Sequence, residues 1–130
     1  MINNKVRKTA KWLLAMYKKI DQTLSDCNRE KLIVEEIPKA IVNTVNVSKE
    51  RAVNINQFRE NLLDSLYFLN DYIYCEFIRP DATGANRIRA RFDIDEYADE
   101  NGVTDRVRVT YGYGICSKIY TINLKDVFNE

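Results

Sequence analysis

The stretch from Asn86 to Ile115 constrains the fold most, because its two halves match when the chain is folded back at Asn101-Gly102. Asn-Gly is the strongest short signal for a two-residue hairpin turn of type I′, in which both central residues need a positive φ. Such a turn predicts an antiparallel hairpin with one apolar side. The apolar pairs are Ile94 with Val109, Phe92 with Tyr111, Ala90 with Tyr113, and Ile88 with Ile115.

The other side of the predicted hairpin is polar. Because side chains alternate along a strand, a slip of one residue would turn its arginines into the core, so the pattern specifies one register strongly. The expected pairs on this side are Asp95 with Arg108, Asp93 with Thr110, Arg91 with Gly112, and Arg89 with Gly114.

Two stretches have the spacing of amphipathic helices, with apolar residues that recur every three or four positions. Residues 3–25 place their lysines mainly on the opposite side, and residues 57–78 follow Asn54 and Asn56, either of which can cap a helix. The apolar stripes are Val6, Ala10, Leu13, Tyr17, Ile20 and Leu24 in the first stretch, and Phe58, Leu62, Leu66, Leu69, Ile73 and Phe77 in the second.

Residues 29–56 allow two interpretations. Glu30–Ile37 fits a short helix that closes near Pro38, because the residue before a proline avoids the helical region. Ile41–Val47 mixes β-branched residues with asparagine and fits a short strand, and Ser48–Arg51 fits a turn or the start of a helix. Helix and strand both stay open for this segment.

Two further segments also have alternatives. Beyond about Asn70, the aromatic and β-branched residues of Tyr72–Ile78 fit a strand as well as a continued helix. After the hairpin, Lys118–Leu124 alternates and predicts a third strand. In the rival interpretation the second strand ends at Tyr111, and Gly112–Gly114 forms the turn into the third.

A sheet with one apolar face needs a cover, and the apolar stripes of the two long helices can supply it. We therefore predict an α+β fold in which N-terminal helices pack on a C-terminal three- to four-stranded antiparallel sheet. With 130 residues, of which 45% are apolar, the chain is expected to form one domain over residues 1–130.

Charge and cysteine content bear on the location of the protein. The net charge of +1 gives no global field that favours nucleic acid or a membrane. No small-residue cleavage site follows the basic N-terminus, and the longest apolar run, Trp12–Tyr17, is too short to span a bilayer. Cys27, Cys75 and Cys116 are odd in number and far apart, which favours free thiols in a reducing cytoplasm.

The residues needed for common catalytic sites are missing from the sequence. The chain has no histidine, so it lacks an imidazole base and any Cys-His or Ser-His pair. Three scattered cysteines cannot supply four zinc ligands, and no glycine-rich loop has the spacing that binds phosphate. We therefore expect a protein that is not an enzyme and needs no cofactor.

An acidic stretch near the predicted turn raises the alternative of a divalent metal. Asp93, Asp95 and the segment Asp99–Gly102 offer oxygen ligands of the kind that calcium prefers. The spacing does not fit an EF-hand loop, because Tyr97 stands where an acid is needed five residues before Gly102. We favour a solvated hairpin tip whose charges discourage edge pairing, and no metal site.

Two basic surfaces are candidate binding sites. Arg87, Arg89, Arg91 and Arg108 lie on the polar side of the hairpin, where guanidinium groups can pair with carboxylate or phosphate. The second surface is the basic side of the first helix, where Trp12 stands beside Lys5, Lys8 and Lys19. The simpler interpretation of both is an ordinary solvated face.

Catalytic groups are absent, and the basic side of the first helix is separate in sequence from the acidic stretch near the turn. These features favour a small protein-binding module of the inhibitor or adaptor type, which recognises a charged protein partner. The alternative is a nucleic-acid-binding protein that uses the same arginines and lysines. An enzyme that relies on carboxylates alone is a third hypothesis. The pattern resembles no family, and it indicates neither the identity of the partner nor the oligomeric state.

Overall fold

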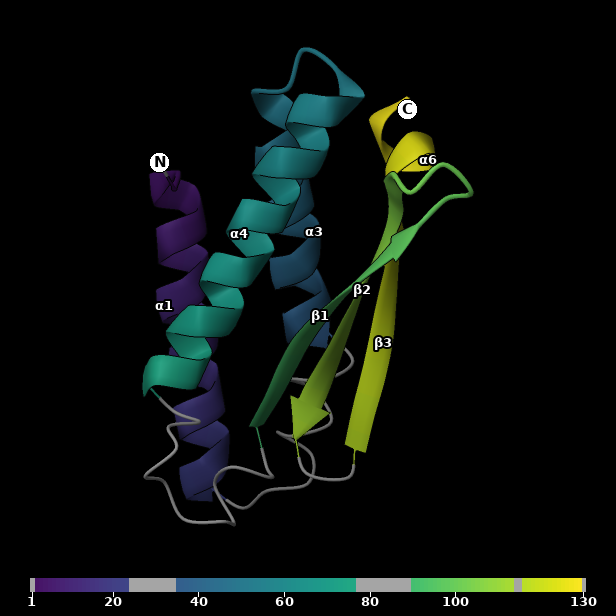
Figure 1. Ribbon diagram of the computed structural model, residues 1–130. Coiled ribbons are helices and arrows are strands. Elements are labelled where there is room, and N and C mark those ends of the chain that lie inside the picture. The colour runs from purple at the N-terminus through teal and green to yellow at the C-terminus, as the bar shows by residue number, and fades with distance from the viewer. Residues whose placement is uncertain (1, 24–34, 77–89, 114–115, 130) are drawn as a thin grey trace.

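The computed structural model describes residues 2–23, 35–76, 90–113 and 116–129. In these residues helices come first and an antiparallel sheet follows, which confirms the predicted α+β class (Figure 1). The helices are α1 (Asn4–Thr23), α3 (Ile37–Glu50), α4 (Ile55–Glu76) and the short α6 (Leu124–Phe128). The strands, in their order across the sheet, are β1 (Ala90–Ala98), β2 (Thr104–Tyr113) and β3 (Cys116–Asn123).

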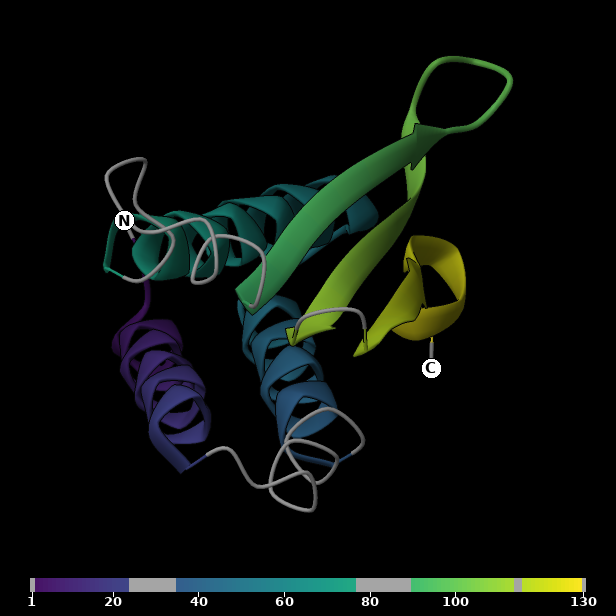
Figure 2. The ribbon, with the colours of Figure 1, turned by 90° about the horizontal axis from the view of Figure 1, so that it is seen from below.

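The layers are arranged with α3 and α4 between the sheet and α1 (Figures 1 and 2). α4 packs against β1, whereas α1 packs on α3 and α4. α1 reaches the sheet through Tyr17, which is fully buried and forms a hydrogen bond with the backbone of Gly112. Of the two long helices expected to cover the sheet, α4 does so directly, while α1 supports the helical layer from behind.

The predicted amphipathic helix at the N-terminus is confirmed as α1. The first four residues of its apolar stripe, from Val6 to Tyr17, are at most 1% exposed. The Asn3 side chain accepts a hydrogen bond from the Lys5 amide at 2.8 Å and so satisfies one of the free N–H groups at the helix start. Ile20 lies in α1, but its side chain is outside the described part, and Leu24 lies outside the described residues.

Of the two interpretations left open for Ile41–Val47, the strand is wrong, because this segment belongs to α3. Buried residues recur at helical spacing, and two polar ones are satisfied within the helix: the Thr44 hydroxyl donates to the Ala40 carbonyl at 2.9 Å, and the Ser48 hydroxyl donates to the Thr44 carbonyl at 2.8 Å. Pro38 stands in the first turn of α3, where a proline loses no helical hydrogen bond. Most of the short helix expected at Glu30–Ile37 lies outside the described residues.

The predicted second long helix is confirmed as α4, and Asn54 is its cap. The Asn54 side chain accepts a hydrogen bond from the Gln57 amide at 2.9 Å, while the Gln57 side chain accepts one from the Val53 amide at 2.9 Å. The helix continues to Glu76 and buries Ile73 completely, so the strand alternative from Tyr72 is wrong as far as Glu76.

The predicted hairpin register is confirmed wherever the structure describes it. Phe92 pairs with Tyr111, Ile94 with Val109, and the polar pairs follow as expected, while the pairs of Ile88 and Arg89 lie outside the described residues. The predicted turn is wrong by one residue. The Asp99 amide donates to the Val103 carbonyl at 2.8 Å, which closes a three-residue loop instead of the two-residue loop.

A second irregularity restores the register. Ala98 pairs with Thr104 but Tyr97 pairs with Arg106, so Asp105 is an extra residue in β2. This β-bulge cancels the shift that the longer loop introduces. The apolar residues of β1 and β2 therefore face the helices as the sequence pattern requires, although the local turn differs.

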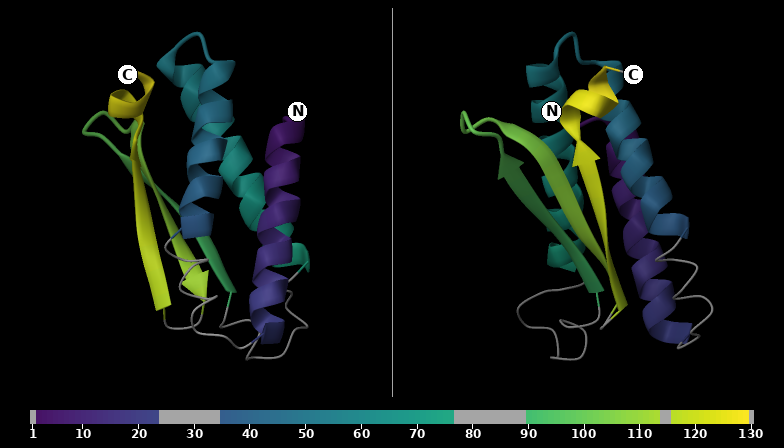
Figure 3. Two further views of the ribbon diagram at one scale, coloured as in Figure 1. Left: turned by 180° about the vertical axis from the view of Figure 1, so that it is seen from behind. Right: turned by 90° about the vertical axis from the view of Figure 1, so that its right-hand side faces the viewer.

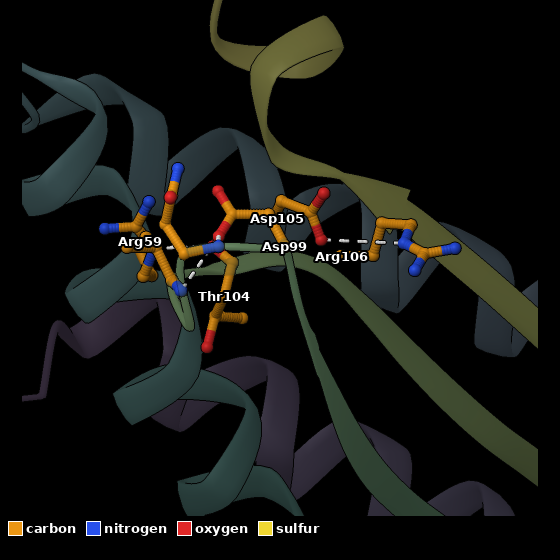
Figure 4. A network of polar contacts seen from close by, with 7 residues as sticks. Arg59, Asp99, Thr104, Asp105 and Arg106 are labelled. Carbon is orange, nitrogen blue, oxygen red and sulfur yellow. Dashed lines mark hydrogen bonds and ion pairs between the residues drawn. The ribbon is translucent and has the colours of Figure 1, made fainter.

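Polar contacts hold the hairpin tip against the start of α4 (Figure 4). The Arg59 Nε donates to the Thr104 carbonyl at 2.8 Å, and its Nη1 donates to the Asn56 side chain at 2.7 Å. Within the loop, the Asp99 Oδ1 accepts hydrogen bonds from the Asn101 and Val103 amides at 2.9 and 3.0 Å. The backbone hydrogen bond from Val103, with a smaller one from Asn101, lowers the pKa of Asp99.

The third strand is confirmed as β3, which pairs with β2 along its whole length. β2 continues to Tyr113, so the interpretation that ended it at Tyr111 is wrong. α6 closes the sheet's apolar side: Leu124 is fully buried, and the rings of Phe128 and Phe58 stack at 5.5 Å. The opposite face of the sheet is covered by none of the described elements (Figure 3).

Replacing Gly102 tests the loop. Gly102 has a φ of 80°, and a Cβ added to it would meet nothing within 4 Å, so any penalty comes from the backbone and not from a clash. We expect Gly102→Val to destabilise the protein by about 1–2 kcal/mol, the cost of a left-handed conformation, and Gly102→Asn to cost less. Urea unfolding of the two variants measures this difference. Equal losses would contradict the backbone explanation.

Replacing Arg59 tests the attachment of the hairpin tip. Arg59→Met keeps an apolar stem but removes both hydrogen bonds, and we expect the free energy of unfolding to fall by about 1–2 kcal/mol. Arg51→Met is the control, because the side chain of this exposed arginine makes no hydrogen bond or ion pair in the described part of the chain. Its expected effect is within about 0.5 kcal/mol. Urea unfolding that shows the same loss for both variants would contradict the role of Arg59.

Candidate functional site

A groove of about 650 Å³ runs between α1 and α3, and we call it the α1–α3 groove. Its residues recur every three or four positions on each helix, so each helix contributes one stripe of its surface. From α1 the groove is lined by Lys5, Lys8, Thr9 and Trp12. From α3 and the residue before it, the groove is lined by Glu36, Lys39, Ala40, Asn43, Asn46, Val47 and Glu50.

The floor of the α1–α3 groove is made by small, buried side chains. Thr9, Ala40 and Val47 are at most 9% exposed. The Thr9 hydroxyl donates to the Lys5 carbonyl at 2.9 Å, so it presents its methyl group without an unsatisfied donor. Small residues at these positions keep the floor low between two helices whose longer side chains form the rims.

The rims are charged, and most of the charges are paired. The Lys5 Nζ lies 3.4 Å from a carboxylate oxygen of Glu50, and the Lys39 Nζ lies 3.7 Å from one of Glu36. Lys8 is exposed and forms neither an ion pair nor a hydrogen bond in the described part of the chain. With three lysines against two glutamates among its lining residues, the groove has one excess positive charge, at Lys8.

Trp12 is the aromatic residue of the groove. It follows Lys8 by one helical turn and is the only tryptophan of the chain. Its side chain is 36% exposed, which is high for a large aromatic residue. Asn43 and Asn46 extend from the facing helix, and their side chains make no hydrogen bond within the described residues. The groove thus combines an apolar floor, an exposed ring, two amide side chains and one unpaired cation.

A second surface is the side of the sheet that faces away from the helices, which we call the outer sheet face. The Arg108 guanidinium lies over the Tyr97 ring, 4.5 Å from its centroid, and Arg106 approaches the same ring at 5.7 Å. Asp95 pairs with Arg108 across the strands as predicted, but Arg108 stacks on Tyr97 and makes no ion pair with Asp95 in the described contacts.

The predicted binding residues are therefore not gathered on one surface. Lys8 and Trp12 lie together in the α1–α3 groove, and Arg108 lies on the outer sheet face, with α3 and α4 between α1 and the sheet (Figure 2). Lys19 belongs to α1 and Arg91 to β1, but their side chains are outside the described part. Arg87 and Arg89 lie outside the described residues.

The groove residues that α3 contributes were not predicted from the sequence. Glu36, Lys39, Asn43 and Asn46 were not recognised, because their segment was left open between helix and strand. The signal that could have found them is the same spacing of three and four residues that buries the opposite side of α3.

The tyrosines with shifted pKa values serve the fold. The Tyr67 hydroxyl donates to the Glu96 carboxylate at 2.6 Å, and this hydrogen bond, ahead of burial, raises the pKa of Tyr67 to about 12. Burial raises the pKa of Tyr17, although a backbone hydrogen bond from Gly112 acts in the opposite direction. Burial also raises the pKa of Tyr111. These groups join helices to the sheet, and none of them lines the groove.

The acidic residues of the hairpin tip were considered as metal ligands in the sequence, and the Asp99 carboxylate has another role in the structure. One oxygen of Asp99 is occupied by two backbone amides, and no group of three acidic or cysteine residues in the described part is arranged to hold a metal ion. The free state of the three cysteines stays a prediction, since Cys27 lies outside the described residues and the side chains of Cys75 and Cys116 are not described.

Comparison with known proteins finds no match among family models, curated proteins or solved structures. Among the described residues, none of the helices combines the length and the apolar character needed to cross a bilayer.

The unpaired state of Lys8 leads to a prediction about stability. Lys8→Ala should change the free energy of unfolding by no more than about 0.5 kcal/mol, because the side chain is exposed and makes no hydrogen bond or ion pair with the described residues. Lys5→Ala removes the ion pair with Glu50 and should cost up to about 1 kcal/mol. Urea unfolding measures both. A loss well above about 1 kcal/mol for Lys8→Ala would show that the fold uses Lys8.

Proposed function

We propose that the protein is a non-enzymatic binding module, of the inhibitor or adaptor type, whose α1–α3 groove holds an acidic segment of a partner protein. The observation that carries this proposal is the position of Lys8, which lies unpaired beside the exposed ring of Trp12 and above an apolar floor. Tryptophan is typical of the few residues that dominate binding energy in protein interfaces.

The chemistry of the groove indicates what the segment should contain. A carboxylate of the partner would pair with the Lys8 ammonium, and a neighbouring apolar side chain would lie on Trp12 and on the floor formed by Ala40 and Val47. Asn43 can donate to and accept from the partner's backbone. The rim pairs formed by Lys5 and Lys39 leave no second free cation in the groove, so a segment with one well-placed acid fits better than a highly acidic one.

The proposal includes a cytoplasmic setting, supported by the odd number of cysteines. Nucleic acid is the less favoured ligand. Arg108, whose side chain is described, is stacked on Tyr97 on the outer sheet face. Lys8 lies on α1, and α3 and α4 stand between α1 and the sheet (Figure 2). A polynucleotide would need several adjacent cations, whereas the groove offers one that is unpaired.

The test uses Trp12 as its own reporter, since no second tryptophan contributes emission. Peptides that place one glutamate or aspartate next to leucine or phenylalanine are selected from a displayed library and titrated while Trp12 fluorescence is recorded. We expect selected peptides to shift the emission, and Lys8→Glu to weaken their binding by about tenfold or more, equivalent to about 1.4 kcal/mol. The matched control is Lys11→Glu, an exposed lysine of α1 outside the groove, which should leave affinity nearly unchanged.

Two outcomes would overturn the proposal. One is a library that yields no peptide whose binding depends on Lys8. The other is an emission change caused by single-stranded DNA or RNA, which disappears as salt rises and is lost in Lys8→Glu, because that result would favour the nucleic-acid alternative. Unfolding curves of both charge-reversal variants exclude a trivial loss of the fold.

A further inference from the structure

Within the described residues, the β3 strand is an edge of the sheet, and this edge is suited to pairing with another strand. It is eight residues long and pairs with β2 without a register shift, so its other side presents a regular row of backbone groups. No backbone hydrogen bond on that other side is found among the described residues. Natural edge strands are normally protected by charges, prolines, bulges or a covering element. β3 has one charged residue, Lys118, and no proline.

The side chains of β3 point to the same conclusion. Ile119 lies on the outer sheet face and is 61% exposed, although Ile122, which faces the helices, is 1% exposed. An isoleucine that is largely exposed in the middle of an edge strand gains burial when another strand is added to that edge.

The opposite edge of the sheet, β1, differs from β3 in its charge and in the regularity of its pairing. β1 carries Asp93, Asp95 and Glu96, and its pairing with β2 contains the bulge near Tyr97. α4 also packs against β1, where the Tyr67 hydroxyl bonds to Glu96. Like charges would therefore oppose the pairing of two β1 edges, whereas two β3 edges meet no such barrier.

We infer that β3 pairs antiparallel with β3 of a second copy of this chain, so that two three-stranded sheets join into one continuous sheet. Antiparallel pairing about a two-fold axis is self-complementary, as a symmetric dimer requires. With the axis at Ile119, this residue meets its own copy, Lys118 lies opposite Tyr120, and Ser117 lies opposite Thr121. No like charges face each other in this register.

This dimer would be compatible with the α1–α3 groove, because α3 and α4 separate α1 from the sheet (Figure 1). The contact is limited to one strand and its outward side chains, so it would be small and its formation reversible. The inference does not depend on the proposed function: a dimer that binds no acidic peptide, or a monomer that binds one, would separate the two.

The test is the oligomeric state of the whole chain by analytical ultracentrifugation, over concentrations from the nanomolar to the high micromolar range. The wild type should show a reversible monomer–dimer equilibrium. Ile119→Lys should raise the dissociation constant by about tenfold or more, since two lysines would meet at the axis. Its melting temperature should stay near that of the wild type, because Ile119 is largely exposed in the monomer.

Two controls make the result specific. Val53→Lys makes the same kind of change, from a β-branched apolar residue to lysine, at a position that is 81% exposed. Val53 lies between α3 and α4 and far from β3 along the chain, so this variant should leave the dimer intact. Hydrogen exchange should show that amides of β3 become more protected as the wild-type concentration rises. If Ile119→Lys unfolds, Ile119→Thr replaces it as the weaker variant, with a smaller shift in the same direction.

A wild-type chain that stays monomeric over the whole range would overturn the inference. So would a dimer that persists unchanged in both Ile119 variants, or one that Val53→Lys disrupts equally. Concentration-dependent protection in α1 or α3 with none in β3 would likewise place the contact elsewhere.

Discussion

The burial of one face of the β1–β2 hairpin is the constraint on which the rest of the structure depends. Phe92, Val107, Val109 and Tyr111 on this face are at most 5% exposed. Full burial of such a side chain is worth roughly 1.5–3 kcal/mol, so a slip of one residue would lose several times that amount at once. A change from a two-residue to a three-residue hairpin loop loses no such burial, and both loop lengths are common in hairpins. The core therefore fixes the register, and the loop and the bulge at Asp105 adjust to it.

This difference in energy explains which features could be predicted from the sequence. The strand pairs from Ala90 to Asp95 were predictable because the burial of the apolar pairs, such as Phe92 with Tyr111, fixes the register of the polar pairs between them. The turn was not, since Asn-Gly is compatible with two loop geometries, and the one that forms also uses the Asp99 carboxylate to bind two amides. A side chain that bonds to its own loop is invisible to a pattern of apolar and polar residues.

The helix of α3 could not be decided from the sequence for a different reason. Ile41, Val45 and Val47 are β-branched, which favours a strand, yet the helix forms because its buried side packs on α1 and α4. Tertiary packing outweighs propensities of a few tenths of a kcal/mol per residue. The same ambiguity hid half of the α1–α3 groove, because Asn46 shares a face with both Lys39 and Asn43 only when the segment is helical. Lys8 and Trp12 could be selected from the sequence since α1 has clear amphipathic spacing.

The position of α1 behind the helical layer has a consequence for binding. Because α3 and α4 stand between α1 and most of the sheet, the α1–α3 groove and the β3 edge are physically separate surfaces. A dimer formed through β3 would contain two α1–α3 grooves in one assembly. A partner with two acidic segments could then bind both, and the second contact would form at the high effective concentration that linkage provides. Modest affinity at a single groove, with one unpaired lysine, would be sufficient for tight binding of such a partner.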